Sequence, residues 1–326
     1  MKFDTIQLWR GLAALYVFLF HTDHHWQIDH GSFIGKMIHN GYTGVDIFFV
    51  ISGFVITLSL KKYTGVKGFV QFILGRFIRI YPTYWIIAAA FLFFGICSEQ
   101  YTSTYLAKSF FLLPGYVLRC TVPSWTLTHE LYFYLLTAGN ILTKTFKLLL
   151  IALVFIGILL LLQTAELFSL NIPARAFWSI YYLEFCSGIL IQFLYQRMNV
   201  KIATISIITG LLLHLALVGK GVPGNWYLFA ISIPAFLIIL GSCAFENIRK
   251  PKIPSLFVWL GNASYILYLI NFGLCIFLPK IIKMSNIPAN LTILLFIGVV
   301  SACALGLHTF MEKPLQRYLN KLILAR

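Results

Sequence analysis

The chain has 326 residues, of which 60% are hydrophobic and only 11% are charged, and its mean hydropathy is +0.85. Since a soluble domain carries about a quarter of its residues as Asp, Glu, Lys and Arg, this composition excludes a soluble fold and indicates a lipid bilayer as the solvent. The net charge of +15 arises from short Lys and Arg clusters between apolar runs, a pattern typical of membrane topology signals, so we expect no nucleic-acid partner.

Ten apolar runs, each bounded by charge, Pro or Gly, predict ten transmembrane helices, because about 20 mainly apolar residues span a bilayer. In chain order they are residues 8–22, 43–60, 82–97, 124–142, 146–163, 176–196, 202–218, 226–245, 256–278 and 291–311. The sequence contains no repeat or linker, so it predicts an all-α polytopic bundle in which residues 1–326 form one domain. Residues 1–10 lead into the first helix without a cleavage site, so we expect this helix to be retained.

The basic residues predict that both chain ends lie in the cytoplasm. With that orientation, 18 of the 25 Lys and Arg residues lie on the inner side, where positive charge collects in membrane proteins. The other seven are Lys36, Lys108, Arg119, Arg175, Lys220, Lys280 and Lys283.

The first predicted helix carries Arg10 and His21 on one face. Eleven residues at 100° each bring them to within about 20° of each other, roughly 16 Å apart along the axis. In one reading the Arg holds an anionic group near the cytoplasm and the His is a general base near the outer surface. In the other, the Arg snorkels and the His is interfacial.

Asp46 lies just inside the outer end of the second predicted helix. A carboxylate there could hold His21 in the tautomer that a base requires. It could equally be a helix-start residue that the helix dipole favours. Farther along the same helix, Ser52 and Gly53 predict a close helix–helix contact.

Arg76 and Arg79 precede the third predicted span, which we expect to begin at Pro82. Three residues apart on a helix, the two arginines face the same way. This arrangement suits a phosphate-bearing ligand. A topology signal would also explain it.

The fourth predicted helix opens on the outer side with Trp125, His129 and Glu130. A carboxylate one turn into an apolar helix is costly unless it is paired. Glu130 is therefore a candidate for a second base or for acceptor binding, whereas His129 reads as an interfacial residue.

The loop after the first helix contains a loose group of histidines and acids, and we expect no metal there because no tight ligand spacing is present. The group consists of Asp23, His24, His25, Asp29, His30 and His39. Of the six cysteines, only Cys97 and Cys120 could meet in an oxidising compartment.

Together the motifs resemble the integral-membrane acyltransferase-3 family, most closely its short exopolysaccharide-modifying members that consist of the membrane domain alone. The resemblance covers nearly the whole chain and depends on the order and spacing of six motifs. These are Gln7-Leu-Trp-Arg10-Gly-Leu-Ala-Ala with His21, Gly44-Val-Asp46-Ile-Phe-Phe-Val-Ile-Ser-Gly53-Phe, Arg76-Phe-Ile-Arg79-Ile-Tyr-Pro82, Ser124-Trp125-Thr-Leu-Thr-His-Glu130, Ala263-Ser264-Tyr265-Ile-Leu-Tyr268-Leu and Glu312-Lys-Pro314.

The resemblance implies an O-acyltransferase of the bacterial inner membrane. It would take an acyl group, usually acetyl, from cytoplasmic acyl-coenzyme A and transfer it to a hydroxyl of an exported or cell-surface polysaccharide or glycan precursor. The family's functional positions map onto Arg10 and His21 (the basic-His motif), Arg76 and Arg79 (coenzyme binding), and Asp46 and Glu130 (the acidic positions).

We therefore expect acetyl-coenzyme A to place its phosphates on the three arginines and its thioester near His21. His21, supported by Asp46 or Glu130, would deprotonate the acceptor or carry the acyl group itself. The motif residues Trp125 and Tyr265 are expected to bind substrate.

One position departs from the family pattern, because Asn271 stands where the family often has His. Asn forms hydrogen bonds but cannot act as a base near neutral pH, so His21 is the preferred base.

Two other classes of protein fit part of the sequence. A transporter or flippase also carries embedded charges, although no inverted repeat is present here. A sensor or scaffold without chemistry would tolerate replacement of Arg76 and Arg79 by Lys.

Overall fold

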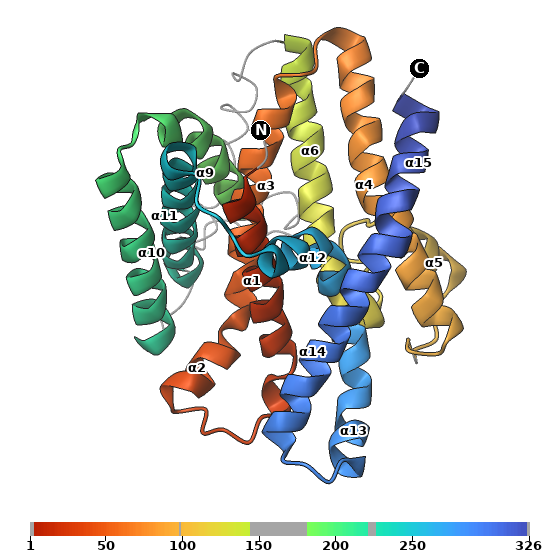
Figure 1. The fold of residues 1–326 in the computed structure, drawn as a ribbon. Coiled ribbons are helices and arrows are strands. Elements are labelled where there is room, and N and C mark those ends of the chain that lie inside the picture. Colours follow the sequence, from red (N-terminus) through yellow and green to blue (C-terminus); the bar gives the residue numbers. More distant parts are fainter. Residues whose placement is uncertain (1–2, 98, 144–180, 221–225, 325–326) are drawn as a thin grey trace, which may run out of the picture.

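The computed structural model describes residues 3–97, 99–143, 181–220 and 226–324, and these residues form an all-helical bundle (Figure 1). The all-α class predicted from the composition is thus confirmed for the described part of the chain. The predicted span 146–163, the first residues of the predicted span 176–196, and Arg175 lie outside the described residues.

The described α-helices vary from short connecting helices to helices of 29 residues. They are α1 (Asp4–His21), α2 (Phe33–His39), α3 (Gly44–Leu60), α4 (Gly65–Phe93), α5 (Ser103–Phe110), α6 (Trp125–Thr143), α9 (Tyr181–Leu194), α10 (Val200–Lys220), α11 (Trp226–Arg249), α12 (Ser255–Leu274), α13 (Leu278–Met284), α14 (Ala289–Leu307) and α15 (Lys313–Leu324). A π-helical turn, His308–Glu312, joins α14 to α15.

Five helical segments of the described chain are long and apolar enough to cross a membrane. They are Gly41–Leu60, Val200–Val218, Ser232–Arg249, Ser255–Met284 and Ala289–Ile323. The chain is thus a polytopic helical membrane protein. The helices α1, α4 and α6 have 18, 29 and 19 residues, but polar side chains interrupt their apolar sequence. Polar groups embedded in a membrane helix often mark a functional site.

The third predicted span does not begin at Pro82, because α4 runs through this proline without interruption from Gly65 to Phe93. A proline removes one backbone hydrogen bond, but a membrane helix tolerates it when neighbouring groups satisfy the backbone. The bond that Pro82 removes is the one to the Ile78 carbonyl, and two residues farther along the Tyr265 hydroxyl of α12 donates to the Ile80 carbonyl at 2.8 Å. The correction places Arg76 and Arg79 within a long helix, not before one.

The helix α3 lies at the centre of the bundle and contacts α1, α6, α9 and α11 (Figure 1). Its contact with α9 depends on two glycines that let the backbones approach closely. A Cβ added to Gly53 would lie 1.9 Å from the Phe185 carbonyl oxygen, and one added to Gly188 would lie 2.1 Å from that of Val50. The close helix contact expected at Gly53 is confirmed.

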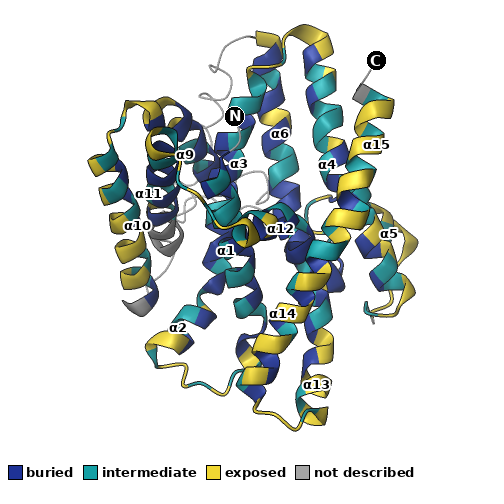
Figure 2. Cartoon of the chain, in the orientation of Figure 1, coloured by how far each residue is buried: buried dark blue, intermediate teal, exposed yellow. Residues whose placement is uncertain are grey.

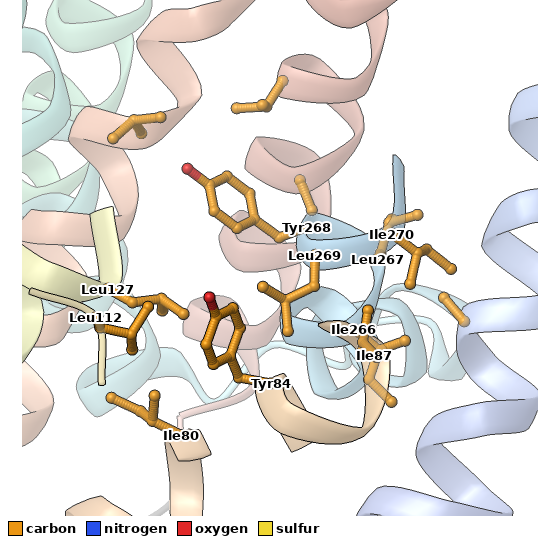
Figure 3. Packing of buried hydrophobic residues seen from close by; sticks show 14 of the residues in the cluster. Ile80, Tyr84, Ile87, Leu112, Leu127, Ile266, Leu267, Tyr268, Leu269 and Ile270 are labelled. Atoms are coloured by element: carbon orange, nitrogen blue, oxygen red, sulfur yellow. The ribbon is translucent and has the colours of Figure 1, made fainter. Parts of the chain in front are cut away.

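The largest group of buried apolar side chains extends across α1, α3, α4, α6, α9, α12 and α14, and its part between α4 and α12 includes Ile80, Tyr84, Ile266 and Leu267 (Figure 3). By contrast, the outer faces of α10 and α14 are exposed, and many of their exposed residues are apolar (Figure 2). Apolar surface facing outward is what a bilayer requires. The polar residues predicted to be functional lie on helices inside this apolar shell.

The connection between α4 and α6 is closed by a disulfide between Cys97 and Cys120, whose Cα atoms are 5.1 Å apart. Sequence alone offered this pair only as a possibility. Beside the disulfide, Arg119 forms an ion pair with Glu99, and this contact lowers the pKa of the Glu99 carboxyl below its usual value. Disulfides persist in oxidising compartments. The disulfide is therefore evidence on which side of the membrane this connection lies.

Candidate functional site

The three arginines predicted to bind an anion line one cavity of about 220 Å³. Arg10 reaches it from α1, and Arg76 and Arg79 reach it from successive turns of α4. The cavity lies between α1, α3, α4, α6 and α12, and we call it the arginine cavity. The spacing of three residues between Arg76 and Arg79 thus brings both side chains to the same face, as expected.

The guanidinium groups of the arginine cavity are available to an anion. Among the described residues, no carboxylate oxygen lies within 4.0 Å of any of the three. Arg76 donates to the Ser59 hydroxyl at 3.0 Å and lies over the rings of Phe72 and Tyr134 at 5.0 and 5.3 Å. Packing against rings orients a guanidinium without neutralising its charge.

Glu130 lines the arginine cavity and not the cavity of His21. Its carboxylate accepts hydrogen bonds from the Tyr134 hydroxyl one turn away and from Ser52 of α3, the latter at 3.2 Å. The sequence led us to expect Glu130 on the same outer side as His21. Because the side chain points along α6 toward Tyr134, it lies with the arginines and contributes negative charge there.

A second acid, Glu312, lies within electrostatic range of Arg10 and Arg79. It is buried in the π-helical turn, where it contacts His308 Nδ1 at 2.7 Å and accepts from Gln316 at 3.1 Å. Single π-helical turns occur often at functional sites. With both acids ionised, the group of three arginines and two acids keeps an excess of positive charge, which favours an anionic ligand.

A second cavity, of about 230 Å³, contains His21, Asp46 and Trp125, and we call it the histidine cavity. His21 is the last residue of α1, Asp46 lies in the first turn of α3, and Trp125 is the first residue of α6. Three residues predicted from separate motifs therefore meet in one space. Tyr265, the other expected substrate-binding residue, lines the arginine cavity instead.

The imidazole of His21 is held by Asn271, not by an acid. His21 Nδ1 lies 2.5 Å from Asn271 Oδ1, and Asn271 Nδ2 donates to the Tyr268 carbonyl at 3.3 Å. Since Nδ2 is engaged with Tyr268, the carboxamide presents its oxygen to the ring, so the proton lies on Nδ1 and the lone pair on Nε2. Asn271 is buried, which fixes this tautomer. The sequence had suggested Asp46 or Glu130 for this position.

Asp46 lies beside Glu184 of α9, a residue that the sequence analysis did not single out. Both carboxyl groups are buried, and Glu184 accepts from the Ser232 hydroxyl at 2.8 Å. Two neighbouring carboxylates repel each other when both are ionised. An acid within the apolar stretch Tyr181–Leu194 was the available signal.

The arginine and histidine cavities meet at Val45 and Tyr268, which line both. The Tyr268 ring extends from α12 (Figure 3). Its centroid lies 5.6 Å from that of the Phe48 ring of α3. At its other end the arginine cavity shares Ile6, Gln7 and Val55 with a third cavity of about 290 Å³, whose rim includes Lys62. The three cavities form a series from the N-terminus of α1 to its C-terminus.

In the segment after α1, the Asp23 carboxylate contacts His39 Nδ1 of α2 at 2.8 Å and His30 Nδ1 at 3.6 Å. No group of three or more potential metal ligands occurs within the described ranges. The two contacts join the turn that directly follows His21 to α2.

Comparison with known proteins gives a family match over residues 3–308, to a model described as "Acyltransferase domain". The chain is 27% identical over 308 residues to "Exopolysaccharide production protein ExoZ" of Rhizobium meliloti (strain 1021), covering 85% of this chain and 90% of that protein. It is 35% identical over 92 residues to "Protein 2 in picA locus" of Rhizobium radiobacter, covering 27% and 43% of the two chains. No solved structure matches.

Proposed function

This chain belongs to the acyltransferase-3 family of membrane proteins, and on that premise we propose that it is an O-acyltransferase acting across a membrane. It takes an acyl group, acetyl in our proposal, from cytoplasmic acyl-coenzyme A. It transfers the group to a hydroxyl of an exported or cell-surface polysaccharide or of a glycan precursor. The similarity to a protein named for exopolysaccharide production supports this class of acceptor.

The observation that carries the proposal is the shared wall of the two cavities. An acyl donor of this class has anionic phosphates at one end and a thioester at the other, joined by a narrow, flexible arm. Phosphates at Arg76 and Arg79 and a thioester beside His21 require two neighbouring cavities, and the arginine and histidine cavities adjoin at Val45 and Tyr268, which line both. Binding energy from the phosphates then positions the reacting end.

The proposal includes an orientation of ten transmembrane helices with both chain ends in the cytoplasm of a bacterial inner membrane. In Figure 1 both marked chain ends lie toward the upper end of the bundle, away from α2 and α13. The bias of the basic residues supports this orientation. The disulfide between Cys97 and Cys120 also supports it, because disulfides persist in oxidising compartments and this one lies in the α4–α6 connection.

In the proposed reaction, His21 Nε2 takes the proton of the acceptor hydroxyl as its oxygen attacks the thioester carbonyl carbon. The C–S bond then breaks, and the proton passes from His21 to the departing thiolate. Asn271 is a positioning residue that holds Nδ1–H. Asp46, which lies beside Glu184, lines the histidine cavity, and Trp125 forms a face of the same cavity.

Asn271→Leu should lower kcat about 10²-fold with little change in KM for the donor, because the imidazole loses the acceptor that fixes its tautomer. Asn271→Asp keeps an oxygen at this position and should retain most of kcat. Steady-state kinetics with varied donor concentration separates the two parameters. Equal kcat in the wild type and in Asn271→Leu would show that Asn271 does not position the base.

The proposed activity is tested with purified protein, acetyl-coenzyme A and surface polysaccharide of the producing cell from which esters have been removed by mild alkali. We expect release of free coenzyme A and an equal amount of O-acetyl ester on the polysaccharide, measured by mass spectrometry. A transporter or flippase would move the glycan between compartments and form no ester, and that result would contradict the proposal.

A further inference from the structure

A further cavity of about 480 Å³ lies at the same end of the bundle as the start of α4, between the C-terminal ends of α3, α6 and α9. We call it the amide cavity because Asn140 of α6 and Gln192 of α9 line it. Its volume lies in the range of small-molecule sites, about 300–1,000 Å³. None of its lining residues in the described chain belongs to the arginine cavity.

Both amide side chains are buried and carry polar atoms without a hydrogen-bond partner among the described residues. Asn140 and Gln192 are each 7% exposed, and in the described part of the chain Asn140 Oδ1 and Nδ2 and Gln192 Oε1 form no hydrogen bond. Leaving a buried polar group unpaired costs about 1–3 kcal/mol. Polar groups that face a cavity at this cost indicate a ligand that completes their hydrogen bonds.

The rim of the amide cavity carries two exposed cations, Lys61 and Arg197. No carboxylate lies within 4.0 Å of either cation among the residues that the structure describes. Tyr63 adds an aromatic ring to the same lining. The cavity thus combines hydrogen-bonding amides at depth, an aromatic surface and positive charge at the opening.

This combination matches an adenine nucleotide. A carboxamide offers a donor and an acceptor side by side, which pair with the adjacent amino group and ring nitrogen of adenine. An aromatic ring stacks on a purine base. Lys and Arg bind phosphate. A lipid headgroup would use the cations but offers no planar edge with a donor and an acceptor for the amides.

The amide cavity and the arginine cavity are separated by a thin aromatic wall. The Tyr63 ring contacts the Phe72 ring at 5.6 Å, and Phe72 contacts Tyr134 at 6.4 Å. Arg76 lies over both Phe72 and Tyr134 and lines the arginine cavity. The Tyr63 and Phe72 rings therefore lie between an adenosine in the amide cavity and a pyrophosphate at Arg76, and the proposed path of the donor requires these rings to turn aside.

We propose that the amide cavity binds the adenosine end of the acyl donor, with Asn140 and Gln192 on the base and Lys61 and Arg197 on the ribose phosphate. This inference rests on the proposed use of acyl-coenzyme A. It assigns a binding site between α3, α6 and α9, whereas the three arginines come from α1 and α4.

The test compares two donors, acetyl-coenzyme A and acetyl-pantetheine, which lacks the nucleotide. Asn140→Leu and Gln192→Leu should each raise KM for acetyl-coenzyme A at least about tenfold. Neither should change kcat/KM for acetyl-pantetheine. Leucine fits an apolar helix interface and removes an unpaired polar group, so both variants should fold. The matched control is Asn320→Leu on the exposed face of α15, which should leave both donors unaffected.

An unchanged KM for acetyl-coenzyme A, or an equal loss with both donors, would overturn the inference while leaving the acyltransferase function intact. Binding of adenosine 3′,5′-bisphosphate, measured by calorimetry, tests the site without turnover. The wild type should bind it and Asn140→Leu should bind at least about tenfold more weakly. Equal binding by the two proteins would overturn the inference, whether or not the preparation transfers an acyl group. Absence of acyl transfer would instead count against the proposed function.

Discussion

His21→Ala should abolish acyl transfer, lowering kcat by about 10³-fold or more, while the protein still inserts in the membrane and binds the donor. General base catalysis contributes about 10²–10⁴-fold, and the described histidine cavity contains no second imidazole. In our proposal the donor phosphates bind in the arginine cavity, so KM for the donor should change little. The measurement is ester formation on the glycan, with donor binding measured in the same preparation.

The matched control for His21→Ala is His24→Ala, three residues farther along the chain, where the side chain is exposed. This control should keep wild-type kcat. Full transfer activity in His21→Ala would exclude His21 both as the base and as a carrier of the acyl group.

Arg76→Ala combined with Arg79→Ala should raise KM for acetyl-coenzyme A by more than about 10²-fold. A hydrogen bond to a charged group contributes about 1.5–3 kcal/mol, and two guanidinium groups act on the donor phosphates in our proposal. The effect on kcat at saturating donor should be smaller, because neither arginine lines the histidine cavity.

A second pair of variants separates anion binding from a topology signal. Arg76→Lys and Arg79→Lys keep the positive charge that orients the helices but lose the bidentate geometry of a guanidinium. We expect normal insertion and a KM raised about tenfold. Arg317→Lys on α15 is the control and should behave as the wild type. Unchanged KM in all lysine variants would mean that the arginines at positions 76 and 79 act only on topology.

The sequence predicted which residues line the two cavities better than it predicted which of these residues contact each other. Arg10, Arg76 and Arg79 could be grouped because helical spacing and positive charge both appear in the sequence, and the structure brings them to one cavity. Likewise His21, Asp46 and Trp125 share a cavity. These residues lie at helix ends or in regular helical registers, where side-chain direction follows from the backbone.

Contacts between helices distant in sequence could not be predicted in this way. The partner of His21 comes from Asn271, 250 residues away, and the partner of Asp46 is Glu184, in a helix that the pattern identified only as apolar. Nothing local in the sequence specifies which helix packs beside which. The passage of α4 through Pro82 was missed for a related reason, since the group that supports the nearby backbone, Tyr265, lies on α12.

The loop chemistry shows the same limit. A disulfide between Cys97 and Cys120 could be proposed from location alone, but the sequence cannot state that the two Cα atoms approach to 5.1 Å. The amide cavity was invisible for the same reason. Asn140 and Gln192 are ordinary polar residues near helix ends, and only their burial without partners reveals a site.

The central claim is that donor and acceptor meet from opposite sides of the membrane. The direct test uses proteoliposomes in which the side of the protein that carries Arg76 and Arg79 faces the outer solution. De-esterified polysaccharide is sealed inside the vesicles. Acetyl-coenzyme A added outside should produce ester on the enclosed polysaccharide, and His21→Ala vesicles should produce none. Absence of ester inside wild-type vesicles, together with ester on polysaccharide supplied on the donor's side, would contradict the account.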